Sequence, residues 1–268
     1  ASRAQDQFMT AHTAVSAPLS GRSFLFLHAH PDDEAIFTGI TMRRLSALGA
    51  RVVLVTATAG EEGGPAGVRV AELEAACTAL GVARLELLGR RDSGMAGTPA
   101  NHHPWALARA DFASLVRQLA ALCAAESVEA LVHYDADGIY GHPDHVSVHH
   151  IGSAAASLAG ITGYEATVDR EYLHFTGRHL VEGPAPRRDG RHVAGQVSAE
   201  ITTAIFGTAE ELAAKRLAMA AHASQIDAAH LLDPAFDEVY RLEWYVRRGS
   251  TGVLEELGNA HLTSLLPS

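Results

Sequence analysis

Cysteine is scarce in this chain. Only two are present in 268 residues, Cys77 and Cys123, and each lies in an alanine-rich stretch of helical pattern. Without a CxxC motif, any bound metal must take nitrogen and oxygen ligands. We expect both cysteines to be small buried side chains in a reducing compartment, not partners in a disulfide.

Basic charge and long apolar runs are also lacking. The chain has 21 Lys and Arg against 31 Asp and Glu, a net charge of −10, with no basic block that would favour nucleic acid or an anionic membrane. No apolar run approaches the ~20 residues of a membrane helix. Residues 1–20 do not have the pattern of a signal peptide and are interpreted as a flexible segment outside the fold. The expected location is the cytoplasm.

Apolar runs do alternate with helical patterns. Strands are predicted at residues 24–27, 52–55, 85–88 and 130–134, and helices at 35–48, 68–80, 105–126 and 145–158. Continuous apolar strands separated by helices favour a doubly wound, mostly parallel α/β sheet of Rossmann-like type over residues 21–160.

The pattern after residue 160 is less regular. We predict a strand at 172–175, an exposed loop at 183–195, a helix at 208–222 and a strand at 239–246. Residues 161–268 are therefore expected to form an α+β extension of the same domain, packed on the rim that carries the functional site.

Two polar motifs follow predicted strands. The first is His28-Ala29-His30-Pro31-Asp32-Asp33-Glu34, and the second is Gly141-His142-Pro143-Asp144-His145. Ligands of doubly wound sheets bind beyond the carboxyl ends of the strands, so the two motifs can meet at one rim.

Three residues of these motifs suit a metal ion. A catalytic zinc typically has three nitrogen or oxygen ligands and an open position for water. His30 and Asp33 supply two ligands from one turn, and His145 supplies a third. The alternative is that these residues only cap helices and form turns. His145 and His149 have another zinc-binding spacing, but the glutamate that helical zinc-protease motifs place beside the first histidine is missing.

The neighbouring polar residues suit acid–base chemistry. Asp32, if Asp33 faces the metal, is a natural general base, with a helix N-cap as the alternative. His142 is placed to stabilise an oxyanion or to protonate a leaving amine. Asp144 can hydrogen-bond an imidazole and fix its tautomer. For His28, which shares a strand face with His30, we expect a satisfied core histidine.

These two motifs resemble those of the LmbE-like, or PIG-L, zinc de-N-acetylases. The similarity covers roughly residues 22–225. Thr56-Ala57-Thr58-Ala59-Gly60-Glu61 is similar to the loop after the family's second strand, and Arg69-x-x-Glu72-Leu73 to the start of its next helix. Asp92-Ser93-Gly94-Met95 and the stretch from Lys215 to Gln225 are similar to the branch that acts on mycothiol and its precursor.

The resemblance implies a role for each site residue. Zinc would be held by His30, Asp33 and His145, with Asp32 as the base. His142 would assist at the tetrahedral intermediate, tuned by Asp144 and helped by Tyr140, while Arg69 and Asp92 would contact the sugar or its aglycone. Glu34 would have a supporting or structural role. Iron(II) is the alternative metal, because it accepts the same ligands.

The activity implied is hydrolysis of an N-acetyl or other N-acyl group from a GlcNAc-type amino sugar on a small molecule. That molecule is either a thiol precursor or a natural-product glycoside. An amidase cleaving mycothiol-like S-conjugates and a non-catalytic metal- or sugar-binding protein are the alternatives. A nucleotide-binding domain is disfavoured, because residues 58–64 do not form a GxGxxG or Walker sequence and carry two carboxylates. The oligomeric state stays open.

Overall fold

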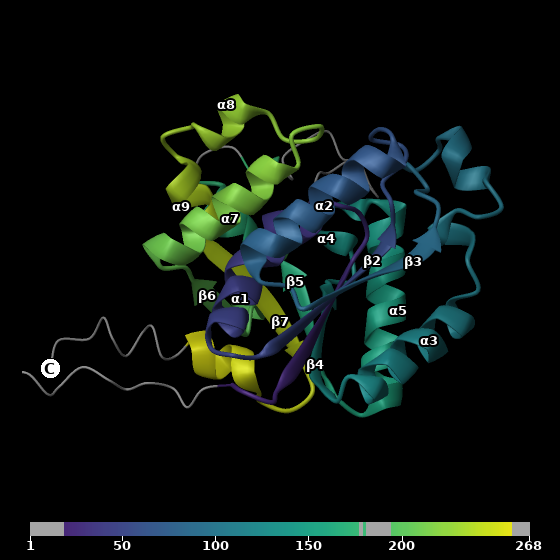
Figure 1. Ribbon diagram of the computed structural model, residues 1–268, viewed down its shortest axis with the longest axis horizontal. Helices are drawn as coiled ribbons and strands as arrows, with labels where there is room; N and C mark the ends of the chain where they lie inside the picture. The colour runs from purple at the N-terminus through teal and green to yellow at the C-terminus, as the bar shows by residue number, and fades with distance from the viewer. Residues whose placement is uncertain (1–18, 177–178, 181–193, 259–268) are drawn as a thin grey trace, which may run out of the picture.

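A computed structural model describes residues 19–176, 179–180 and 194–258 (Figure 1). Within them, seven strands form one sheet in the order β3-β2-β1-β4-β5-β7-β6. Strands β1 to β5 are parallel, whereas β7 runs antiparallel to both β5 and β6. Their bounds are β1 Ser23–His28, β2 Arg51–Thr58, β3 Arg84–Arg90, β4 Val128–Tyr134, β5 Thr162–Thr167, β6 Thr203–Phe206 and β7 Leu242–Arg248.

Helices cover both faces of this sheet (Figure 1). Helix α1 packs against α2 and α7 on one face, and α3 packs against α5 on the other. The predicted doubly wound α/β class is confirmed. The helix bounds are α1 Asp33–Ala47, α2 Ala66–Leu80, α3 Phe112–Ala125, α4 Gly138–Gly141, α5 Pro143–Ala159, α6 Arg170–Leu173, α7 Ala209–Ala221, α8 Ala228–Leu231 and α9 Phe236–Tyr240, with short 3-10 turns at Pro99–His102, Leu107–Arg109 and Ser198–Glu200.

The core lies between the sheet and these helices. All six residues of β1 are buried, as expected of a strand with a helix layer on each face. The two cysteines are free and buried, as predicted. Strands β5, β6 and β7 come after residue 160 and extend the sheet beyond β4. Residues before and after 160 therefore share one sheet.

Several predicted elements were wrong or misplaced. Residues 172–175 do not form a strand, because helix α6 begins just before them and includes 172 and 173. The Asp169 carboxylate caps this helix by accepting the backbone N–H groups of Glu171 and Tyr172. The helix predicted from residue 105 begins at Phe112, because Asp111 is its N-cap, and the exposed Trp105 precedes it in a loop. The strand predicted at 239–246 begins at Leu242, while β5 and β6 were not predicted at all. Residues 1–18 and 181–193, which hold most of the predicted N-terminal segment and exposed loop, lie outside the described residues.

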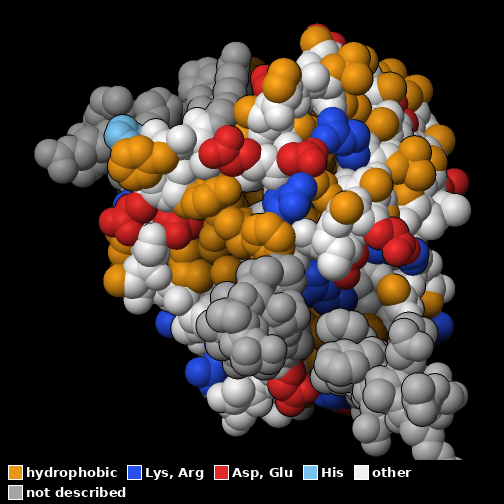
Figure 2. All heavy atoms as spheres, turned by 90° about the vertical axis from the view of Figure 1, so that its left-hand side faces the viewer, with side chains coloured by type: hydrophobic (Ala, Val, Ile, Leu, Met, Phe, Trp, Pro, Cys, Tyr) orange, Lys and Arg blue, Asp and Glu red, His pale blue; other side chains and the backbone are white. Residues whose placement is uncertain are grey.

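One face of the molecule carries charged side chains of both signs (Figure 2). Figure 2 shows one face, on which acidic and basic side chains are interspersed among hydrophobic ones without merging into a basic surface. In the part of the chain that the structure describes, no helix has the length and apolar character needed to cross a membrane.

Candidate metal centre

The two polar motifs meet where the strand order reverses. From β1 the chain continues to β2 on one side, whereas β4 lies on the other side of β1. Such a switch point opens a crevice at the carboxyl ends of the two strands. The end of β1 and the start of α1 bring His30 and Asp33 to this crevice. From the other side of the crevice come His142, the N-cap residue of α5, and His145 in the first turn of that helix.

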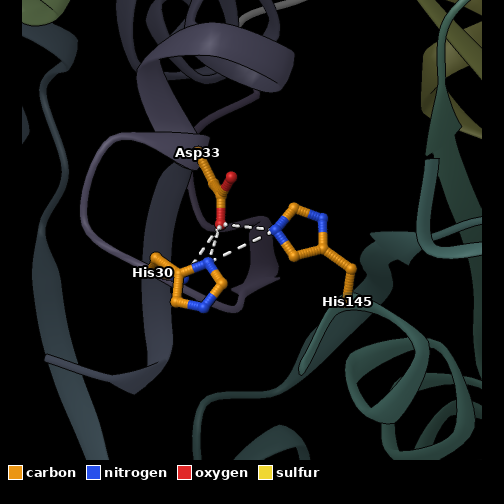
Figure 3. Close-up of side chains that lie close together, drawn as sticks. All are labelled: His30, Asp33 and His145. Atoms are coloured by element: carbon orange, nitrogen blue, oxygen red, sulfur yellow. Dashed lines mark hydrogen bonds and ion pairs between the residues drawn. The ribbon is translucent and has the colours of Figure 1, made fainter. Parts of the chain in front are cut away.

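Three side-chain atoms form an equilateral triangle (Figure 3). The His30 Nδ1, Asp33 Oδ2 and His145 Nε2 atoms are separated pairwise by 3.3 Å, 3.3 Å and 3.3 Å. Ligands on a tetrahedral zinc, at bond lengths of about 2.0–2.1 Å, lie about 3.3–3.4 Å from one another. The donor set and its spacing therefore fit one zinc-sized cation, and the three predicted ligands are indeed brought together.

Neighbouring side chains orient both imidazoles. The His30 Nε2 atom lies 3.3 Å from Asp144 Oδ2 and 3.6 Å from Asp92 Oδ1, so its N–H donates there and Nδ1 keeps its lone pair for the triangle. The His145 ring stacks on Tyr134, with ring centroids 4.4 Å apart. Burial lowers the pKa of His30, but hydrogen bonds to Asp144, Asp33 and Asp92 outweigh it and raise that pKa well above its usual value. This surplus of negative charge favours a cation.

Asp32 lies beside the triangle but is not part of it. Its Oδ2 atom accepts a bond from Arg69 Nη2 at 3.0 Å, and the side chain keeps 18% of its surface exposed. Burial and the adjacent Asp33 raise the pKa of Asp32 to about 7, against the opposing effect of Arg69. Asp32 occupies the N-cap position of α1, yet its side chain makes no capping bond, so the structure does not support the N-cap alternative.

His142 is held in one tautomer. Its Nδ1 atom caps α5 by accepting the Asp144 backbone N–H at 3.1 Å, so the neutral ring carries its proton on Nε2. Burial and the nearby His30 and His145 lower the pKa of His142 to about 2. A neutral ring with an N–H donor suits oxyanion stabilisation better than proton donation to an amine. The Tyr140 hydroxyl lies 3.2 Å from His145 Nε2, at the edge of the triangle.

The two residues expected to contact substrate are buried. Arg69 is 4% exposed, and its guanidinium donates to the carbonyls of Pro31 and Gly60 as well as to Asp32. A Cβ on Gly60, whose φ is +69°, would lie 2.2 Å from Arg69 Nη1, so the glycine is needed for this arrangement. Asp92 faces His30 and accepts the Gly94 N–H at 2.8 Å.

Two assignments gain detail. Asp144 bonds the imidazole of His30, whereas its link to His142 is through its own backbone N–H. His28 is the satisfied core histidine predicted, because its two nitrogens bond Tyr134 and Thr38 at 2.9 Å and 2.8 Å. The described residues contain two groups able to hold a metal, His30–Asp33–His145 and His30–His142–Asp144. His149 belongs to neither and bonds the Tyr134 carbonyl instead.

Sequence reasoning missed two residues around the site. Tyr134, the last residue of β4, supports His145 by stacking, and no motif marks it. His222, at the end of α7, bonds Glu34 with an Nε2–Oε1 distance of 2.6 Å. The only signal for His222 was its place in the stretch 215–225 that resembles the mycothiol branch.

Known proteins match this chain in sequence. Residues 25–156 match the family described as GlcNAc-PI de-N-acetylase, PIG-L. A 1D-myo-inositol 2-acetamido-2-deoxy-alpha-D-glucopyranoside deacetylase from Catenulispora acidiphila is 38% identical in sequence, and the match covers 79% of this chain and 77% of that protein.

Solved structures share the fold. The N,N'-diacetylchitobiose deacetylase from Pyrococcus horikoshii gives a TM-score of 0.58 at 18% identity, covering 86% of this chain and 85% of its own. A deacetylase of the teicoplanin biosynthesis pathway also gives 0.58 at 18% identity, covering 85% of this chain and 100% of its own. At these identities the likeness shows the fold alone.

Proposed function

Because the chain belongs to the PIG-L family, we propose that it hydrolyses the N-acetyl group of a GlcNAc-type amino sugar on a small molecule. The products are acetate and a free amine. The observation that carries this proposal is the buried His30–Asp33–His145 triangle together with Asp32. The Asp32 carboxylate lies next to the triangle but is not one of its three ligand groups. A carboxylate beside a metal site that makes no capping bond favours activation of a water molecule over metal binding alone.

The three triangle residues are proposed to hold zinc, with iron(II) as the alternative. A bound divalent cation would polarise the acetamide carbonyl and acidify a water molecule. The fit rests on ligand spacing and on the carboxylates that hold His30 in the metal-binding tautomer.

Asp32 is proposed as the general base. The attacking water gives its proton to a carboxylate oxygen of Asp32 as the water oxygen bonds to the amide carbon. Arg69 holds one of those oxygens, so the carboxylate cannot turn away from the crevice. After attack, the same proton is available to the leaving amine nitrogen as the C–N bond breaks.

His142 and Tyr140 are proposed to stabilise the oxyanion. The Nε2–H of His142 is the donor that its capping bond leaves free, and Tyr140 brings a hydroxyl to the edge of the triangle. One such donor typically contributes about 3–4 kcal/mol to transition-state stabilisation. Asp144 keeps His30 oriented. Contacts of Arg69 and Asp92 with the sugar stay predictions, because the contacts described for them are with the protein.

For the substrate, an N-acetylglucosaminyl-inositol is our first choice. The relative from Catenulispora acidiphila is named as a deacetylase of the 2-acetamido-2-deoxy-alpha-D-glucopyranoside of 1D-myo-inositol and is 38% identical. An N-acylated natural-product glycoside is the second, since a neighbour of the same fold is a deacetylase of teicoplanin biosynthesis. An amidase for thiol S-conjugates is the third.

An assay that follows both released acetate and newly formed primary amine tests the proposal. Purified protein reconstituted with zinc is incubated with GlcNAc-inositol, N,N'-diacetylchitobiose, an N-acylated glycopeptide and an S-conjugate amide. We expect acetate from the first, at a higher kcat/KM than from the others. Cleavage of the S-conjugate alone would replace the deacetylase by the amidase, and binding without turnover of any compound would contradict both.

A further inference from the structure

The backbone at Asp32 adopts a conformation that side-chain-bearing residues disfavour. Its φ is 116° and its ψ is −33°, and only two other described residues besides glycine have a positive φ. Such a conformation persists only where surrounding contacts hold it, and it is concentrated at functional sites. The contacts that hold Asp32 are therefore part of the site.

Both polar groups of the peptide unit before Asp32 are tethered. The Asp32 N–H donates to Glu34 Oε2 at 3.0 Å, while the carbonyl of Pro31, in the same peptide unit, accepts from Arg69 Nη2. Rotation of this peptide unit would break both bonds. Arg69 holds it from α2, and Glu34 holds it from the first turn of α1.

Glu34 depends on His222. The two side chains are both fully buried, and His222 Nε2 lies 2.6 Å from Glu34 Oε1 across 188 residues of sequence. One Glu34 oxygen thus faces His222 while the other holds the Asp32 N–H. A buried carboxylate without its partner is unfavourable and would turn toward other donors.

We propose that His222 is a positioning residue for the base: through Glu34 it fixes the Pro31–Asp32 peptide and so aims the Asp32 carboxylate. This inference rests on the proposed function, since it assigns a task to the base of that reaction. It also gives the segment after residue 160 a part in turnover, because His222 is the C-cap residue of α7.

The same helix provides a matched control. Lys215, also on α7, is 1% exposed and lies 2.8 Å from the buried Glu243 Oε1. Glu243 in turn accepts the backbone N–H groups of Ile40 and Thr41 in α1. Both buried pairs therefore join α7 to α1, but only the His222 pair reaches Asp32. Loss of either pair is expected to destabilise the protein. Of the two losses, only that of the His222–Glu34 pair is expected to misalign Asp32.

The experiment compares His222→Leu, His222→Gln and Lys215→Met in zinc-loaded protein, with kcat and KM for acetate release, metal content and Tm. We expect His222→Leu to lower kcat about 100-fold, the typical effect of a small misplacement of a catalytic group, with KM little changed and one metal per chain. The Gln side chain can donate to Glu34, so His222→Gln should recover most of kcat. Lys215→Met should lower Tm and leave kcat near the wild-type value below its Tm.

The outcomes separate this inference from the proposed function. A His222→Leu kcat equal to wild type, a loss of equal size in Lys215→Met, or no recovery in His222→Gln would overturn the inference. If His222→Leu does not fold, His222→Asn replaces it. The amide of Asn is too short to reach Glu34, so the same fall in kcat is expected. Absence of acetate release by the wild type would instead overturn the proposed function.

Discussion

Replacing Asp32 by Asn isolates proton transfer from metal binding. The amide keeps an oxygen for Arg69 and the size of the carboxylate, but it cannot accept the proton of water at neutral pH. Asn also tolerates a positive φ better than most residues, which matters at the 116° of this position. The fold should therefore survive the change.

The expected loss in rate is large. A positioned general base typically contributes about 10²–10⁴-fold, so kcat should fall by that factor and the activation free energy should rise by about 3–5 kcal/mol. Metal content should stay at one per chain, because none of the three triangle atoms belongs to Asp32. Arg69 keeps its two carbonyl acceptors, so the loss in the free energy of unfolding should stay below about 3 kcal/mol.

The assay measures acetate release together with bound metal, and its control is Asp33→Asn. The two carboxylates are adjacent in sequence, but only Asp33 lies in the triangle, so Asp33→Asn should lose both metal and turnover. Asp32→Asn could instead keep more than a tenth of the wild-type kcat, or lose its metal as Asp33→Asn does. Either result would refute the assignment of Asp32 to proton transfer and Asp33 to metal binding.

Three further changes test other parts of the site. His142→Ala should lower kcat about 10²–10³-fold at unchanged metal content, the effect of removing an oxyanion donor; an unchanged kcat would exclude His142 from that role. Gly60→Ala should reduce both kcat and Tm, because its Cβ would lie 2.2 Å from Arg69 Nη1; a variant as stable and active as wild type would show that Arg69 can move freely. Lys215→Met should lower the free energy of unfolding in urea by about 3–5 kcal/mol, because it leaves Glu243 buried without its charge partner; a smaller loss than for an exposed pair such as Arg22–Glu129 would contradict that reasoning.

Strands β1, β2 and β4 could be predicted because each contains a continuous apolar run. Residues of β1, β2 and β4 are buried on both faces, which produces continuous runs that sequence alone displays. Strand β5 lacks such a run. Its Glu165 is buried and has Arg248 Nη2 at 2.9 Å, a partner known only from the fold. Strand β6 has four residues at the edge of the sheet, too short for a pattern.

The site was predictable where chemistry is local in sequence. His30 and Asp33 are three residues apart, and the position of His145 after another strand placed it at the same rim. The support of Asp32 was not predictable, because it depends on contacts from α2 and α7. The family resemblance implied a substrate contact for Arg69, and the bonds described for it are to Asp32 and two backbone carbonyls. The tautomer of His142 likewise follows from a capping bond that only coordinates reveal.

Metal titration of the apo protein tests the central claim most directly. Protein stripped by chelation is titrated with zinc while bound metal and acetate release from GlcNAc-inositol are followed together. Our account predicts no turnover without metal and a rise in activity that reaches its plateau at one zinc per chain, with both signals lost in His145→Ala. Full activity of the metal-free protein, or zinc-restored activity in His145→Ala equal to wild type, would contradict it.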